Sequence, residues 1–248
     1  MGVRSSHNSM TQHKRKSKRA GTCGIVLAAG KSARFRGMKY KQFDHLRGTP
    51  LFIHTLKAVL RLNFITSVLV VLPSSKIQYG KRTIETWIPQ PKIAIVCIAG
   101  GKTRTESTYR ALRYLKDNPP SYVLIQDAAR PMMKSQIAAA VHAKARKTGA
   151  AIVGRPMTDS LAYVKDSRTR KTLDRTNVYA TYTPHCYTFT LIAKAHERAQ
   201  KRKMLEQENA DLVLLSGKPV SIVPTTGIDI KVTYPEDLAT VESLLKIR

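Results

Sequence analysis

Residues 24–42 carry the pattern that most restricts what this chain can fold into. The apolar run at 25–28 predicts a buried parallel strand, which ends at Ala29-Gly30. The loop that follows combines small residues with cations such as Lys31, Arg34 and Lys41. Small side chains let backbone amides approach a phosphate, and the cations neutralise its charge. The segment therefore predicts a polyphosphate-binding loop, with a solvated basic turn as the alternative interpretation.

Two common phosphate-binding motifs are absent from this loop. No Gly-x-x-x-x-Gly-Lys-[Ser/Thr] sequence follows the strand, and Gly30 and Gly37 do not have the spacing of Gly-x-Gly-x-x-Gly. The sequence therefore disfavours a Walker-type NTPase and a dinucleotide-binding protein.

Apolar runs and amphipathic segments alternate along the chain. We predict strands at 25–28, 67–72, 93–98, 122–125, 150–154, 220–223 and 228–232, and helices from 50, at 76–87, 104–116, 134–147, 188–204 and 206–217, and from 235. This alternation predicts an α/β fold, a Rossmann-like three-layer α/β/α sandwich with a mostly parallel sheet. Ligands bind beyond the carboxyl ends of such strands, so we expect the functional loops at 29–42, 100–107 and 126–131.

The chain is strongly basic. Its 248 residues include 43 Lys or Arg and 16 Asp or Glu, for a net charge of +27. Such a charge attracts anions but does not distinguish nucleotides from nucleic acids. Residues 1–20 contain no acid and no apolar core of a secretory signal. We expect them to form a basic disordered tail ahead of one domain at 21–248.

The cysteines and the hydropathy pattern bear on location. Cys23, Cys97 and Cys186 show no metal-binding or redox spacing, which favours a reducing compartment. No apolar run is long enough to predict a membrane span. We therefore expect a cytoplasmic protein without membrane contact, and the basic tail leaves a plastid as the minor alternative.

Residues 155–180 interrupt the strand–helix alternation. Segments 160–165 and 169–175 have the alternating character of strands, and Asp166-Ser167 suits the turn between them. The result is a projecting β-hairpin too polar to belong to a core. An isolated hairpin is only marginally stable in water, so we expect this segment to be a dimerisation arm that packs on a second subunit.

A second chemical cluster, Asp127-Ala128-Ala129-Arg130-Pro131, follows the predicted strand at 122–125. A carboxylate at this end of a strand can hold a metal ion or a sugar hydroxyl. The alternative interpretation is an ion pair between Asp127 and Arg130 that shapes the turn.

These motifs, in this order, resemble a known enzyme family. Ala28-Ala29-Gly30, Arg34-Phe35 and Lys41-Gln42 fall at the spacing of nucleotidyltransferases that make sugar and polyol nucleotides. The cluster at 127–131 and the segment that begins at Ile230-Lys231 resemble two signatures of the 2-C-methyl-D-erythritol 4-phosphate cytidylyltransferases of the non-mevalonate isoprenoid pathway. The resemblance implies a nucleotidyltransferase domain at 21–248 that transfers a cytidylyl group from CTP to that polyol phosphate, with release of pyrophosphate.

The resemblance also implies roles for individual residues. The implied catalytic residues are Arg34, Lys41 and Lys231. The implied nucleotide-binding residues are Ala28, Ala29, Gly30, Gly100, Gly101, Ser107 and Asp127. The implied acceptor-binding residues are Arg130, Asp159, Ser160, Arg175 and Thr183. The family further implies Mg²⁺ as cofactor, with Asp127 as its candidate ligand, and a homodimer that exchanges arms.

One segment departs from the family pattern. Gln207-Glu208-Asn209-Ala210 stands where Thr-Asp-[Asp/Glu]-Ala is usual. A cytidylyltransferase for another polyol phosphate, such as ribitol 5-phosphate, is therefore an alternative. The net charge motivates a second one, a nucleic-acid-binding protein on a degenerate nucleotidyltransferase scaffold. The presence of Arg34, Lys41 and Lys231 disfavours it, and the aromatic residues lack the clustering of a base-stacking surface.

Overall fold

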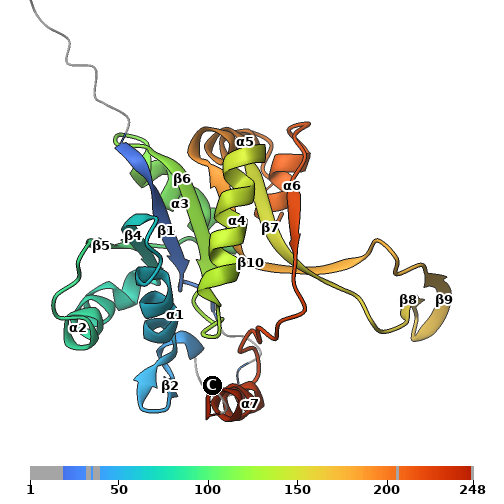
Figure 1. Cartoon of the computed structure of the whole chain (residues 1–248), viewed down its shortest axis with the longest axis horizontal. Helices are drawn as coiled ribbons and strands as arrows, with labels where there is room; N and C mark the ends of the chain where they lie inside the picture. The colour runs from blue at the N-terminus through green and yellow to red at the C-terminus, as the bar shows by residue number, and fades with distance from the viewer. Residues whose placement is uncertain (1–18, 32–34, 36–39, 205–206, 247–248) are drawn as a thin grey trace, which may run out of the picture.

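The structure is a computed structural model that describes residues 19–31, 35, 40–204 and 207–246 (Figure 1). A seven-stranded sheet forms its centre, in the order β11-β7-β10-β6-β1-β4-β5. These strands are β1 Arg19–Leu27, β4 Ile65–Leu72, β5 Ala94–Ala99, β6 Pro120–Asp127, β7 Ala150–Pro156, β10 Tyr179–Thr188 and β11 Ser221–Pro224. Strand β10 runs antiparallel between β6 and β7, and the other neighbours pair in parallel. The predicted, mostly parallel sheet is confirmed.

Helices cover both faces of the sheet. They are α1 Leu51–Leu60, α2 Ile77–Trp87, α3 Arg104–Leu115, α4 Ser135–Thr148, α5 Phe189–Lys201, α6 Asn209–Leu214 and α7 Pro235–Lys246. Successive residues of a strand point to opposite faces, so each central strand supplies two separate cores. In β1, Val26 packs in a cluster with residues of α1, α2 and α4, whereas Ile25 packs with residues of α3, α5 and α6. The three-layer arrangement is thus confirmed.

Helix α7 lies beyond the carboxyl ends of the strands and closes a third apolar cluster. Val241 of α7 packs with Val232, Met132 and Phe35 in this cluster. The backbone of Val232 is also fixed, because its amide donates to the carbonyl of Ala129 at 2.9 Å. These contacts hold the segment that carries Lys231 against the loop that follows β6.

The predicted hairpin is present as β8 Leu161–Lys165 and β9 Arg168–Leu173, an antiparallel pair separate from the main sheet. Asp166 and Ser167 form its turn with φ values of 52° and 57°. From 158 to 179 every residue except Leu161 is exposed. The hairpin projects from the body of the molecule (Figure 1). Its geometry agrees with the predicted arm, and its role in dimerisation stays a prediction.

The structure corrects three sequence-based expectations. Strand β10 was not predicted, because Pro184 interrupts its apolar pattern; the register with β7 shifts between Tyr182 and His185 to accommodate it. Residues 228–232, predicted as a strand, form no ladder in the structure. Residues 1–18 of the predicted tail lie outside the described residues, but Arg19 belongs to β1 and pairs with Pro120.

The membrane prediction can be examined for the described residues alone. Among them, no helix combines the length and the apolar character that crossing a membrane requires.

Candidate active site

A pocket of about 220 Å³ opens where β1, β5 and β6 end. We call it the first pocket. It gathers many of the residues that the sequence singled out, namely Ala28, Ala29, Gly30, Lys41, Gly101, Ser107, Asp127 and Lys231. The three loops predicted at the carboxyl edge of the sheet therefore meet in space, and the roles of their individual residues stay predictions.

Gly100 is needed for the close approach of two of these loops. A Cβ atom on Gly100 would collide with the Cβ of Ala29 and lie 2.9 Å from the Ser107 hydroxyl. Such contacts are too short for a side chain to be tolerated without movement of the backbone. The glycine thus lets the end of β5 pack directly against the loop after β1.

Hydrogen bonds inside the chain fix the shape of the first pocket. The buried Gln42 side chain donates to the carbonyls of Ala28 and Gly30, which positions the neighbouring Lys41 at the pocket wall. On the other side, the Ser107 hydroxyl accepts from the amide of Gly101 at 3.0 Å and donates to the carbonyl of Thr103 at 2.9 Å. In this structure Ser107 therefore shapes the loop, and its predicted contact with a nucleotide remains to be tested.

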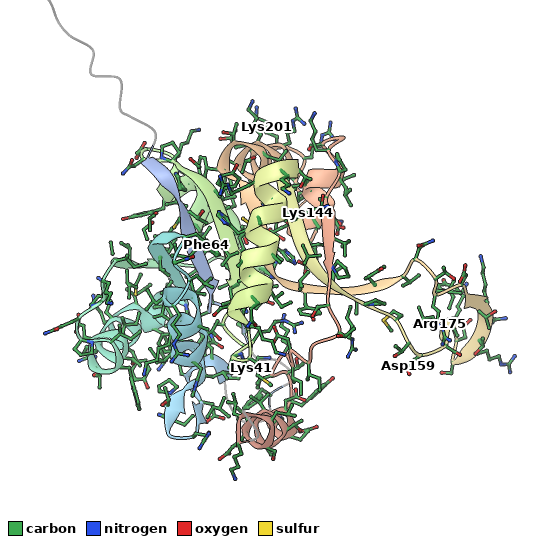
Figure 2. All side chains as sticks on the ribbon, viewed as in Figure 1. Lys41, Phe64, Lys144, Asp159, Arg175 and Lys201 are labelled. Carbon is green, nitrogen blue, oxygen red and sulfur yellow. The ribbon has the colours of Figure 1, made fainter. Side chains whose placement is uncertain are left out.

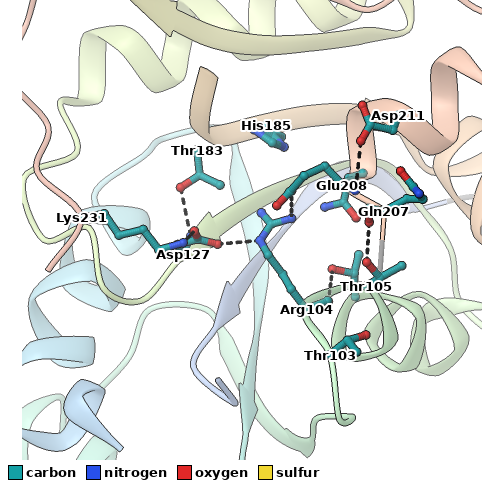
Figure 3. A network of polar contacts seen from close by, with 12 residues as sticks. Thr103, Arg104, Thr105, Asp127, Thr183, His185, Gln207, Glu208, Asp211 and Lys231 are labelled. Atoms are coloured by element: carbon teal, nitrogen blue, oxygen red, sulfur yellow. Dashed lines mark hydrogen bonds and ion pairs between the residues drawn. The ribbon is translucent and has the colours of Figure 1, made fainter. Parts of the chain in front are cut away.

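A row of four charged side chains, which we call the charge bridge, extends from the first pocket. It consists of Glu208, Arg104, Asp127 and Lys231 (Figure 3). Arg104 Nε lies 3.0 Å from Asp127 Oδ1, and Lys231 Nζ lies 2.8 Å from Asp127 Oδ2. Arg104 also reaches Glu208, with 2.8 Å between Nη1 and Oε2. Both Asp127 oxygens are thus engaged by cations.

The charge bridge keeps Asp127 and Arg104 ionised. Burial alone would raise the pKa of Asp127, but the nearby charges of Arg104 and Lys231 outweigh it and hold that pKa well below its usual range. Burial would likewise lower the pKa of Arg104, yet Asp127 and Glu208 raise it above its ordinary value. The site therefore retains the Arg104 cation and the Asp127 carboxylate across the physiological pH range.

A second pocket of about 210 Å³ lies on the other side of the charge bridge. It is lined by Arg130, Thr183 and His185, and it shares Arg104, Asp127 and Lys231 with the first pocket. Arg104, Asp127 and Lys231 therefore form a wall common to the two pockets.

Three of the side chains that line the second pocket and not the first have defined contacts. The Thr183 hydroxyl accepts from the amide of Asp127 at 3.2 Å. Arg130 stacks over the ring of Tyr182 at 4.7 Å and donates from Nη1 to the carbonyl of Asp229 at 2.7 Å. Burial, followed by the charge of Arg104, lowers the pKa of His185 to about 3, so this imidazole is neutral. The alternative Asp127–Arg130 ion pair does not form, because Asp127 binds Arg104 and Lys231 instead.

The remaining predicted residues lie elsewhere. Arg34 falls outside the described residues. Asp159, Ser160 and Arg175 lie on the arm; Figure 2 shows Asp159 and Arg175 far from Lys41. Arg175 donates from Nη1 to the carbonyl of Thr158 within the arm. A single chain thus does not bring the arm residues to either pocket.

Sequence reasoning assigned no role in the site to two members of the charge bridge, Arg104 and Glu208. A signal for Arg104 existed, because it is the first residue of α3, three positions after the Gly100-Gly101 strand break. A cation at a helix N-terminus opposes the helix dipole, so this placement points to a role outside the helix. Glu208 had no comparable signal, since acidic residues are common at helix N-termini.

The first pocket offers little protein ligation for a metal. Asp127 is its one acidic side chain among the described residues. Across the same part of the chain, no group of three or more His, Cys, Asp or Glu side chains is placed to hold a metal ion. Mg²⁺ needs few protein ligands where phosphates and water supply the others. A Mg²⁺ ion here would be carried chiefly by nucleotide phosphates, and Asp127 would hold it only after releasing Arg104 or Lys231.

Comparisons with known proteins identify the family. Residues 22–247 match the family described as IspD, 2-C-methyl-D-erythritol 4-phosphate cytidylyltransferase. The enzyme of that name from Carboxydothermus hydrogenoformans is 33% identical over 221 residues, which cover 89% of this chain and 93% of the relative. The one from Bacillus mycoides is 30% identical and covers 90% and 97%, respectively.

Solved structures show the same fold. The 2-C-methyl-D-erythritol 4-phosphate cytidylyltransferase of Thermus thermophilus aligns with a TM-score of 0.72 and 27% identity, over 90% of this chain and 98% of that one. The 4-diphosphocytidyl-2C-methyl-D-erythritol synthase of Anaerococcus prevotii aligns with a TM-score of 0.79 at 22% identity, over 92% and 99%. From its sequence match and its fold, this chain belongs to the IspD family of cytidylyltransferases.

Proposed function

We propose that the chain transfers a cytidylyl group from CTP to 2-C-methyl-D-erythritol 4-phosphate, which yields 4-diphosphocytidyl-2-C-methyl-D-erythritol and pyrophosphate. The observation that carries this proposal is the wall of Arg104, Asp127 and Lys231 between two pockets, within a member of the IspD family. The first pocket would take CTP, and the second would take the polyol phosphate. The two substrates would then meet at Lys231, which lines both.

The reaction is an in-line displacement at phosphorus. An oxygen of the acceptor phosphate attacks the α-phosphorus of CTP, a new phosphorus–oxygen bond forms, and the bond to the β-phosphate oxygen breaks as pyrophosphate leaves. The nucleophile is already an anion, so the site needs no general base. Catalysis then consists of positioning two anions and stabilising the charge between them.

Three cations carry that charge stabilisation in our proposal. Lys41 and Arg34 would bind the phosphate oxygens of CTP, and Lys231 would bind the attacking phosphate. Lys231 suits this position because Asp127 orients its ammonium group at 2.8 Å while 41% of its side chain remains exposed. Asp127 would hold a Mg²⁺ ion once it releases one of its two cation contacts, and the ion would supply positive charge to the triphosphate and to pyrophosphate.

We further propose that the enzyme is a cytoplasmic homodimer in which each arm completes the second pocket of the partner. Two features of the arm support this: Tyr163 and Val164 are 57% and 54% exposed, and the arm projects from the body (Figure 1). Such apolar side chains gain most from burial in an interface. Asp159, Ser160 and Arg175 would then reach the acceptor of the partner. The free cysteines at 23, 97 and 186 suit a reducing compartment.

Subunit complementation tests the shared site. Lys41→Ala and Arg175→Ala chains, each nearly inactive alone, are mixed under conditions that exchange subunits. One site of each mixed dimer would then combine both native residues, so activity should return to roughly a quarter of wild type at random pairing. A mixture that stays inactive after confirmed exchange would refute the exchange of arms.

Pyrophosphate release from four nucleoside triphosphates, measured against a panel of polyol phosphates, tests the reaction itself. We expect CTP with 2-C-methyl-D-erythritol 4-phosphate to be the preferred pair. Ribitol 5-phosphate is the competing acceptor, since Gln207 and Glu208 occupy the segment that departs from the usual family pattern. A preference for ribitol 5-phosphate, or for another nucleotide, would contradict the proposal.

A further inference from the structure

Glu208 is held in a fixed position at the edge of the second pocket. It caps α6, where its side chain accepts from the backbone amide of Asp211 while the Asp211 side chain accepts from the amide of Glu208. Arg104 Nη1 contacts its Oε2 at 2.8 Å from the other direction. Glu208 lines the second pocket and not the first, and 61% of its side chain is exposed. The carboxylate is thus both oriented and open to a ligand.

The neighbours of Glu208 are anchored as well. The Thr105 hydroxyl donates to the carbonyl of Gln207, and the buried Asn209 side chain pairs with His196 Nε2 at 3.0 Å. These contacts tie the segment to α3 and α5. Orientation of the carboxylate therefore results from the packed structure around it.

The charge bridge gives the second pocket two chemically different ends. Lys231 and Glu208 lie on opposite sides of the Asp127–Arg104 pair (Figure 3). At the Lys231 end, Asp127 has both of its oxygens engaged by cations. At the other end, the Glu208 carboxylate repels an anion and accepts hydrogen bonds from hydroxyl donors. An acceptor with one phosphate and several hydroxyls can satisfy both ends in a single orientation.

We propose that Glu208 is a specificity-determining residue, which binds hydroxyl groups of the acceptor while its phosphate lies at Lys231. The inference rests on the proposed function and adds to it the orientation of the acceptor in the second pocket. Lys231 lines both pockets, so a phosphate bound there lies next to the α-phosphate of CTP. The opposite orientation would place the phosphate against Glu208 and away from the nucleotide.

The test uses two acceptors that differ in hydroxyl groups. The nucleophile is the phosphate itself, so n-butyl phosphate is chemically competent although it has no hydroxyl to offer Glu208. Values of kcat/KM are measured for 2-C-methyl-D-erythritol 4-phosphate and for n-butyl phosphate, at saturating CTP. The ratio of the two values is the preference for hydroxyls, and losses of folded enzyme or of nucleotide binding cancel from it.

We expect Glu208→Gln to lower this ratio about tenfold, the effect of one partly exposed hydrogen bond to a charged group. The kcat/KM for n-butyl phosphate should fall by a smaller factor than that for 2-C-methyl-D-erythritol 4-phosphate, because n-butyl phosphate has no hydroxyl for Glu208 to bind. Glu208→Asp keeps a good helix cap, but its carboxylate lies one methylene further from the acceptor. Its ratio should therefore lie between those of the wild type and Glu208→Gln. Glu197→Gln, which removes an exposed carboxylate paired with Lys116, should leave the ratio unchanged.

Equal losses with both acceptors would show that Glu208 only supports Arg104 or α6, and would overturn the inference. An unchanged ratio in an active Glu208→Gln enzyme would overturn it too, and would leave the proposed function intact. A wild-type enzyme that transfers the cytidylyl group to neither acceptor would overturn the proposed function and this inference with it.

Discussion

Asp127→Asn is the substitution whose energetic effect the structure defines best. Asp127 is 8% exposed, and its two oxygens hold Arg104 and Lys231 at 3.0 and 2.8 Å. Asparagine keeps the shape of the side chain but removes the charge that both cations neutralise. Removal of one partner from a fully buried ion pair costs about 3–5 kcal/mol of unfolding free energy.

Two features of the site reduce that value. The side chains of Arg104 and Lys231 are 23% and 41% exposed, so water solvates them after the substitution. Glu208 also keeps one ion pair with Arg104 at 2.8 Å. We therefore expect Asp127→Asn to lower the free energy of unfolding by roughly 2–3 kcal/mol. For a chain of this length, Tm measured by calorimetry at pH 7 should fall by about 4–12 °C.

Glu197→Gln is the matched control for this prediction. The Lys116–Glu197 pair has a similar length, 3.1 Å, but its side chains are 69% and 45% exposed. Exposed pairs contribute less than about 1 kcal/mol, so Tm of this variant should fall by no more than about 4 °C. Equal melting temperatures for the two variants would refute the argument that burial makes the Asp127 pairs strong.

Three further predictions concern the pockets and pH. Lys41→Ala should lower kcat by about 10²–10³ with little change in Tm, because a preorganised cation is lost at the α-phosphate; near-normal turnover would remove Lys41 from the mechanism. Gly100→Ala should raise the KM for CTP, because its Cβ collides with Ala29; an unchanged KM would contradict the loop packing. Burial lowers the pKa of His185 to about 3 and that of His196 to about 4. Between these values and pH 6.5 the unfolded chain binds protons that the folded chain does not. The free energy of unfolding should therefore fall as pH drops from 7 to 5, and its dependence on pH should be weaker in His185→Gln.

The sequence predicted the strands correctly wherever their apolar or alternating pattern was uninterrupted. The buried parallel strands read as continuous apolar runs, and the hairpin followed from alternation around Asp166-Ser167. Strand β10 was not predicted because Pro184 and several polar residues break its apolar pattern. In the structure its pairing with β6 and β7 holds it in the sheet. Tertiary pairing here overrides local propensity.

The location of the site was predictable from the sequence, but the contacts among its side chains were not. Strand ends located the three loops, since topology brings the carboxyl ends of parallel strands together. The partners of Asp127 could not be found this way, because Arg104 and Lys231 lie 23 and 104 positions away. The partner nearest in sequence, Arg130, donates to the carbonyl of Asp229 instead. Such choices depend on side-chain geometry, which the sequence pattern does not specify.

Direct transfer between the two pockets is the central claim, and an isotope label tests it. The acceptor phosphate is prepared with ¹⁸O in its non-bridging oxygens, and the products formed with CTP are examined by ³¹P NMR. Attack by the acceptor phosphate predicts ¹⁸O in the bridge between the two phosphorus atoms of the product, bonded to the former α-phosphorus, and none in pyrophosphate. Pyrophosphate that carries the label, or a product whose former α-phosphorus bears no ¹⁸O, would contradict this mechanism.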